Sequence, residues 1–140
     1  MKVLYALFFA LFLALAPLPG TGAMAGDTDP LFINATTDDP HRAKMALLFA
    51  QNQLERKHPV AVFLNDKAVY LGSKAHASKF GEHQEIIAGL IKNGASIVIC
   101  PMCMKHFEIK EADLVEGIKV GNPELTGSLL FKDNTKTLTW

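Results

Sequence analysis

The chain has 140 residues, and its 14 lysines and arginines are balanced by 14 aspartates and glutamates, so the formal net charge is zero. A chain without a basic surplus has no electrostatic footprint for nucleic acid or for anionic lipid. Its mean hydropathy is positive, at +0.17, partly because of an apolar amino-terminal stretch.

The first 25 residues have the three parts of a secretory signal peptide. Lys2 precedes an apolar stretch over residues 3–16, and the small-residue pattern Ala23-Met24-Ala25 follows. The apolar stretch is shorter than the roughly 20 residues that a membrane-spanning helix needs. We therefore expect cleavage after Ala25, export to the periplasm or another exported location, and no membrane association after leader removal.

Removal of the leader takes away Lys2 and no acidic residue, which leaves 13 basic and 14 acidic residues and a formal charge of −1. Residues 26–140 have the length of one domain with a single core. No nucleic-acid partner is predicted for such a surface.

The first elements of this domain are a strand and a helix. Residues 31–35 form a short apolar run, and Asp39 followed by Pro40 is typical of a helix start, with Asp39 as the N-cap. Apolar residues then recur with helical spacing and predict one buried stripe, made of Ala43, Ala46, Leu47, Ala50 and Leu54. The small side chains in this stripe favour close packing on a sheet.

A second strand is predicted over residues 59–64, and a short strand over 68–71. A polar segment over 72–83 leads into a helix whose apolar face consists of Ile86, Ile87, Leu90 and Ile91. Gly94 is placed to end that helix in the left-handed conformation. The β-branched run over 95–99 predicts a third strand that is buried on both faces.

The remaining chain continues the alternation of strands and helices. A short helical piece is expected over residues 108–116, a strand over 118–120, a helix over 122–131 and a last strand over 137–140. This alternation predicts a three-layer α/β domain with a mostly parallel sheet of about five strands and right-handed crossovers.

Both cysteines lie where the third strand gives way to a helix, in Cys100-Pro101-Met102-Cys103-Met104-Lys105-His106. Pro101 suits the first turn of a helix. Unpaired backbone N–H groups and the helix dipole at such a position favour a thiolate over a thiol. The carboxyl ends of parallel strands are also where open α/β sheets bind their ligands.

Three interpretations of this stretch compete. The two cysteines form a structural disulfide, or they perform sulfur chemistry in which one thiol attacks a sulfur donor and the other resolves the product. In the second case His106, three residues from Cys103 on one helical face, tunes the thiol. In the third, the soft ligands of the stretch bind Cu(I) in a periplasmic metal-binding module.

Purely structural or solvent-exposed roles are the alternatives to these chemical roles for several side chains. Met102 and Met104 are expected to fill the core beneath a turn rather than to bind a metal. A solvated surface position is the alternative for His106. His76 and His83 precede the second long helix, and we expect them to be solvated polar residues rather than part of the cysteine site.

The domain resembles the DsrE/DsrF-like superfamily, which includes the DsrEFH, TusD and YchN proteins. The resemblance covers nearly all of residues 26–140. Its most specific parts are Phe63-Leu64-Asn65-Asp66 after the second strand and Cys100-Pro101-Met102-Cys103 after the third. The resemblance implies a flavodoxin-like α/β domain that assembles into homotrimers or homohexamers.

The resemblance also implies that Cys100 carries a persulfide, as the strand-end cysteine does in the sulfur-relay members of the superfamily. We therefore expect an exported protein that binds or relays sulfane sulfur through Cys100, with Cys103 as the resolving thiol and His106 or Lys105 tuning it. The expected partners are sulfur-donor and sulfur-acceptor proteins or small sulfur compounds. No cofactor is predicted, and a non-catalytic binding domain with incidental cysteines is the remaining alternative.

Overall fold

The structure is a computed structural model that describes residues 26–140, so the predicted leader lies outside the described residues. Five strands form one sheet in the order β4-β3-β2-β1-β5, and all four neighbouring pairs are parallel. The strands are β1 (Leu31–Ala35), β2 (Val60–Leu64), β3 (Ser96–Ile99), β4 (Lys119–Val120) and β5 (Lys136–Thr139). The predicted parallel sheet of about five strands is confirmed.

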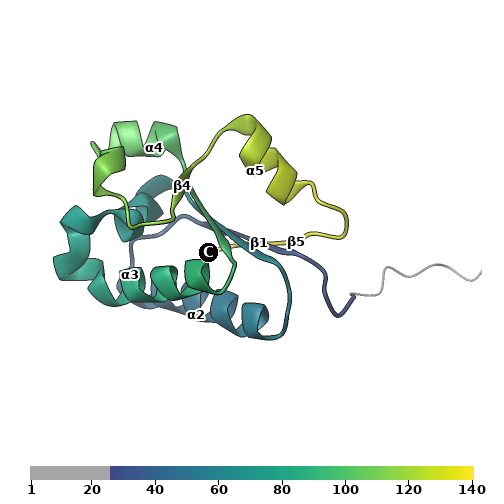
Figure 1. The fold of residues 1–140 in the computed structure, drawn as a ribbon. Coiled ribbons are helices and arrows are strands. Elements are labelled where there is room, and N and C mark those ends of the chain that lie inside the picture. The colour runs from purple at the N-terminus through teal and green to yellow at the C-terminus, as the bar shows by residue number, and fades with distance from the viewer. Residues whose placement is uncertain (1–25) are drawn as a thin grey trace, which may run out of the picture.

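Helices cover both faces of the sheet. Helices α2 (Pro40–Glu55) and α3 (Ala77–Lys92) lie together on one side, and α5 (Pro123–Leu130) lies on the opposite side (Figure 1). The described residues thus form the three-layer, flavodoxin-like α/β domain that was predicted. No helix in this part of the chain has the length and apolar character needed to cross a membrane.

Helix α2 begins where its sequence predicts. The Asp39 carboxylate accepts a hydrogen bond of 2.8 Å from the backbone N–H of Arg42, and Pro40 is the first helical residue. Its predicted stripe packs inward, with Leu54 half-buried and four residues fully buried: Ala43, Ala46, Leu47 and Ala50. Small side chains at three of these positions let the helix approach the sheet closely.

Helix α3 ends as expected at its carboxyl terminus. Gly94 has a φ of 95°, in the left-handed region, and its N–H donates to the carbonyl of Ile91. The chain can therefore turn at once into β3, whose Ile97, Val98 and Ile99 are all buried. This short connection brings the end of β3 and its cysteine to the carboxyl edge of the sheet.

The strand predicted over residues 68–71 is wrong. This segment belongs to a 3-10 helix, η1 (Asp66–Gly72), which the Asn65 side chain caps by accepting from the N–H of Asp66. A short apolar run does not by itself distinguish a strand from a buried helical turn. Packing decides here, because Ala68, Val69 and Leu71 are all buried in the core.

Two more short helices occupy the connections. The polar segment after η1 contains η2 (Lys74–His76), and α3 then starts at Ala77. The helical piece expected over residues 108–116 is shorter than predicted, since only η3 (Glu111–Asp113) is helical there. Helix α4 (Pro101–His106) follows β3 directly, as the proline predicts.

Candidate functional site

Two turns lie side by side at the carboxyl edge of the sheet. In the parallel pair of β2 and β3, Leu64 is in register with Ile99. The N–H of Cys100 donates to the carbonyl of Leu64 at 3.0 Å, so Cys100 and Asn65, the residues that follow these two strands, are neighbours. The sheet therefore brings together the two motifs on which the family resemblance most depends.

Cys100 is buried and occupies the N-cap position of α4. Its side chain is 6% exposed, and its Sγ accepts a hydrogen bond of 3.3 Å from the backbone N–H of Cys103. A backbone N–H aimed at a sulfur atom stabilises negative charge that develops there. Both cysteines are free thiols in the structure, so it does not contain the structural disulfide considered above.

Cys103 is half-buried and lies between the two turns. Its thiol donates to Asn65 Oδ1 at 3.1 Å, while its Sγ accepts from the backbone N–H of Asp66 at 3.3 Å. Burial, with a contribution from the adjacent Cys100 thiol, raises the pKa of Cys103, and the Asp66 N–H acts in the opposite direction. The arrangement thus favours a protonated Cys103 beside a sulfur at a helix N-cap.

His106 lies at the carboxyl end of α4, exposed to solvent. Its ring stands edge-on to Phe107, with 4.6 Å between the centroids. Among residues 26–140, neither His106 nor Lys105 is hydrogen-bonded to a cysteine sulfur. A role of His106 in tuning the thiol, which its spacing from Cys103 suggested, therefore stays a prediction.

The soft-metal alternative is not favoured. The described residues contain no group of three or more histidine, cysteine, aspartate or glutamate side chains that could hold a metal ion. Met104 is buried in the core, as expected, but the same expectation is wrong for Met102, which is 79% exposed. The two thioethers therefore have different environments, one in solvent and one in the core.

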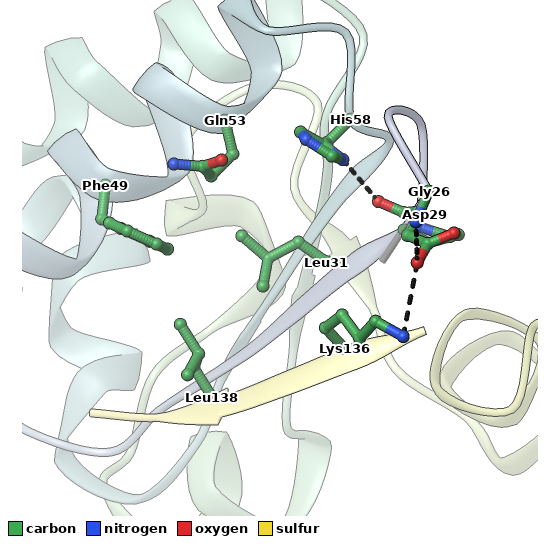
Figure 2. Close-up of a pocket in the computed structure, with 9 residues that line it drawn as sticks. Gly26, Asp29, Leu31, Phe49, Gln53, His58, Lys136 and Leu138 are labelled. Atoms are coloured by element: carbon green, nitrogen blue, oxygen red, sulfur yellow. Dashed lines mark hydrogen bonds and ion pairs between the residues drawn. The ribbon is translucent and has the colours of Figure 1, made fainter. Parts of the chain in front are cut away.

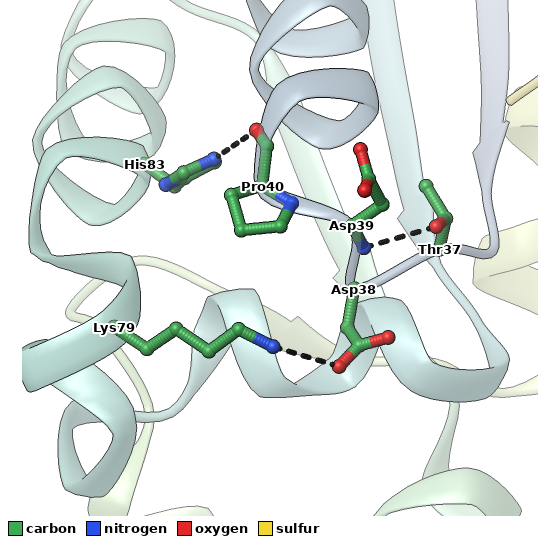
Figure 3. Close-up of polar contacts among 6 residues, drawn as sticks. All are labelled: Thr37, Asp38, Asp39, Pro40, Lys79 and His83. Atoms are coloured by element: carbon green, nitrogen blue, oxygen red, sulfur yellow. Dashed lines mark hydrogen bonds and ion pairs between the residues drawn. The ribbon is translucent and has the colours of Figure 1, made fainter.

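Of the two histidines expected before the second long helix, His76 ends η2, whereas His83 lies within α3. His83 is buried rather than solvated, which corrects the prediction, and its Nε2 lies 2.8 Å from the carbonyl oxygen of Pro40 at the start of α2 (Figure 3). The His76 ring packs against that of Tyr70, with 4.6 Å between the centroids and the ring planes tilted by 48°. His83 thus links α3 to α2.

A shallow cavity of about 230 Å³ lies at the other end of the sheet. It is lined by Leu31 and Lys136, which begin β1 and β5, together with Phe49 and His58. At its rim, the Asp29 carboxylate forms an ion pair with Lys136, and the Asp29 backbone carbonyl lies 2.8 Å from His58 Nδ1 (Figure 2). Because the strands are parallel, this cavity and the cysteines are at opposite ends of the sheet.

From the sequence, Asn65 is predictable only as part of a turn and of a family motif. The structure adds that its carboxamide contacts the Cys103 thiol, 38 positions away in the chain. Asn65 also lines a cleft of about 340 Å³ on the α5 side of the sheet. The sequence feature that could have identified Asn65 as a site residue is its position directly after a buried parallel strand, at the edge of the sheet where ligands bind.

The described residues are a flavodoxin-like, three-layer α/β domain with a parallel sheet and two thiols at the carboxyl edge of that sheet. The model of the DsrE/DsrF-like family matches residues 31–134. This chain belongs to the DsrE/DsrF-like family.

Two other proteins are similar to this chain in sequence. An uncharacterized protein of Methanocaldococcus jannaschii is 35% identical over 98 residues, which are 69% of this chain and 86% of the relative. An uncharacterized protein of Methanopyrus kandleri is 31% identical over 80 residues, or 56% of this chain and 66% of the relative.

Two solved structures share the fold at low sequence identity. The YchN protein of E. coli has a TM-score of 0.65 at 20% identity, covering 79% of this chain and 100% of YchN. A protein of unknown function from Methanobacterium thermoautotrophicum has a TM-score of 0.67 at 13% identity, covering 80% and 99%.

Proposed function

We propose that this protein carries sulfane sulfur as a persulfide on Cys100. The DsrE/DsrF-like family is associated with sulfur relay. The observation that carries the proposal is the placement of Cys100: a thiol at the end of a buried parallel strand, with a backbone N–H directed at its sulfur and a second thiol beside it. A persulfide is more acidic than its parent thiol, so the same N–H would stabilise the product anion.

Thiosulfate is one donor that can transfer a sulfane sulfur to Cys100. The Cys100 thiolate attacks the outer sulfur of thiosulfate, a sulfur–sulfur bond forms, and the bond to the sulfite group breaks. Sulfite leaves with the electron pair of that bond, and Cys100 keeps the transferred sulfur as a persulfide anion. A polysulfide donor follows the same route and releases the shortened polysulfide.

Intact mass spectrometry tests loading directly. Reduced protein incubated with thiosulfate or polysulfide should gain the mass of one sulfur atom, and a reductant should remove it. Cys100→Ser should abolish the gain, whereas Cys103→Ser, the matched control in the same helix, should still load. An unmodified wild-type mass with every donor would contradict the proposal, and so would undiminished loading of Cys100→Ser.

Export is the second part of the proposal and rests on the sequence of residues 1–25. An exported protein would take its sulfur from, and deliver it to, sulfur proteins or small sulfur compounds outside the cytoplasm. We also propose a homo-oligomer, as the family resemblance implies. Strand β5 supports this, because it is an edge strand with four exposed residues and can pair with another chain.

A further inference from the structure

We infer that Asn65 is a positioning residue that keeps Cys103 protonated. It thereby prevents the Cys103 thiolate from attacking a persulfide on Cys100. This inference deepens the proposed function and rests on it. Three groups are hydrogen-bonded to one another where the turn after β2 meets α4: the Asn65 carboxamide, the Asp66 backbone N–H and the Cys103 thiol.

The orientation of the Asn65 carboxamide is fixed by its neighbours. Its Oδ1 accepts from the N–H of Asp66 at 2.9 Å, which requires the oxygen, and not the NH₂ group, to face the turn. The same Oδ1 lies 3.1 Å from Cys103 Sγ. An oxygen can only accept, so the proton between these two atoms has to come from the thiol.

Ionisation of Cys103 removes that hydrogen bond. A thiolate at this position would face the carbonyl oxygen of Asn65 with no proton between them, and two acceptors would then repel each other. The N–H of Asp66 remains as a donor to the sulfur at 3.3 Å, but it is shared with Asn65 Oδ1. Asn65 therefore stabilises the protonated form of Cys103 relative to the thiolate.

The backbone of the turn is shaped for this sharing. Asp66 has a φ of 47°, a left-handed conformation that is uncommon for residues other than glycine and most accessible to asparagine and aspartate. In that conformation its single N–H points at both Asn65 Oδ1 and Cys103 Sγ. The turn thus links the end of β2 to α4 through the thiol itself.

The state of Cys103 decides the fate of a persulfide on Cys100. A Cys103 thiolate that attacks the inner sulfur forms a Cys100–Cys103 disulfide and expels hydrosulfide, so the sulfane sulfur is lost. Attack on the outer sulfur moves that sulfur to Cys103 and leaves Cys100 as a thiolate. Both reactions need the Cys103 thiolate, because the thiolate is the nucleophile. A protonated Cys103 performs neither, and the persulfide persists until an external acceptor arrives.

The first test measures Cys103 alone and needs no sulfur donor. In a Cys100→Ser background, whose hydroxyl can still accept from the Cys103 N–H, the pH dependence of iodoacetamide labelling gives the midpoint of Cys103 ionisation. Asn65→Ala should lower this midpoint, and each unit of lowering raises the thiolate fraction at neutral pH about tenfold. Asn65→Asp keeps an oxygen to cap Asp66 but adds negative charge, so it should raise the midpoint.

The opposite directions separate positioning from damage to the fold. A variant that merely loosens the turn would expose Cys103 and move both midpoints down toward that of a free thiol. Unchanged midpoints, or a shift of both in one direction, would overturn the inference. Circular dichroism of each variant identifies a loss of folding, and Asn65→Asp, which retains the cap, serves as the folding-matched variant.

The second test uses the protein with both cysteines, loaded with sulfur from polysulfide. Asn65→Ala should release hydrosulfide and form the Cys100–Cys103 disulfide faster than wild type, and Asn65→Asp more slowly. Equal release rates in all three proteins would contradict the inference. Wild-type protein that never loads would instead refute the proposed function, while the labelling midpoints would still report the role of Asn65, so the two failures are distinguishable.

Discussion

Single residues set the chemistry of the carboxyl edge. Cys100 and Cys103 are three positions apart, yet one is buried at a helix N-cap and the other shares its proton with Asn65. A sequence cannot distinguish two such cysteines, because the difference arises from a turn 38 positions away. The strand-end placement of Cys100 was predictable from the apolar run before it and the proline after it.

The raised pKa of Cys103 predicts a pH dependence. In folded Cys100→Ser protein, labelling of Cys103 should reach half its maximal rate above pH 9.0, the ordinary value for a thiol, because burial raises the pKa of Cys103. The same protein unfolded in urea is the control and should label with an ordinary midpoint. Equal midpoints in the folded and unfolded protein would show that burial has no such effect.

The same shift predicts how stability depends on pH. The folded state binds the Cys103 proton more tightly than the unfolded state, so this contribution is fully present below pH 9.0 and is lost as the pH rises through the folded-state pKa. Urea unfolding of Cys100→Ser should therefore show a stability that declines above pH 9 more steeply than in the Cys100→Ser, Cys103→Ser double variant. Parallel curves would exclude the linkage.

Elements follow sequence patterns where local chemistry specifies them. The N-cap at Asp39, the proline starts of α2 and α4 and the glycine end of α3 were all predictable, because each depends on neighbouring residues. Helix η1 was not, since the burial of its short apolar run depends on contacts distant in sequence. The exposure of Met102 and the burial of His83 were missed for the same reason.

Two glycines at the end of α3 should respond to alanine with opposite signs. Gly94 has a φ of 95°, and no atom lies within 4 Å of a methyl group added there. Gly94→Ala should therefore lower the free energy of unfolding by about 1 kcal/mol through backbone strain alone. Gly89 is helical and equally free of close atoms, so Gly89→Ala should gain about 0.5–1 kcal/mol. Urea denaturation measures both, and a loss of equal size at both sites would contradict this reading of the helix end.

The whole molecule presents apolar side chains on the side of β5 and α5. Phe131 is 82% exposed just after α5, and Leu138 is 38% exposed on β5. If this surface joins copies of the chain, Phe131→Glu should shift the protein toward monomers in sedimentation experiments. Met102→Glu is the matched control, because Met102 is as exposed but lies on α4, and it should leave the assembly intact. Identical sedimentation of wild type and Phe131→Glu would exclude this surface as the interface.

The amino terminus predicts the processed form of the molecule. Gly26 would begin the mature chain, and its nitrogen lies 2.8 Å from an oxygen of Asp29, which also pairs with Lys136 on β5 (Figure 2). Cleavage after Ala25 would place a charged amino group beside that carboxylate. Intact mass and amino-terminal sequencing of protein from the exported fraction should give a chain that starts at Gly26. A chain that starts at Met1 would contradict cleavage.

The most direct measurement is the state of Cys100 and Cys103 in protein isolated from its native location, determined by intact mass and peptide mapping with and without reductant. We expect an additional sulfur atom on the peptide that contains Cys100, removed by the reductant, with Cys103 as a free thiol. A plain Cys100–Cys103 disulfide that stays unreactive toward sulfur donors after reduction would contradict it.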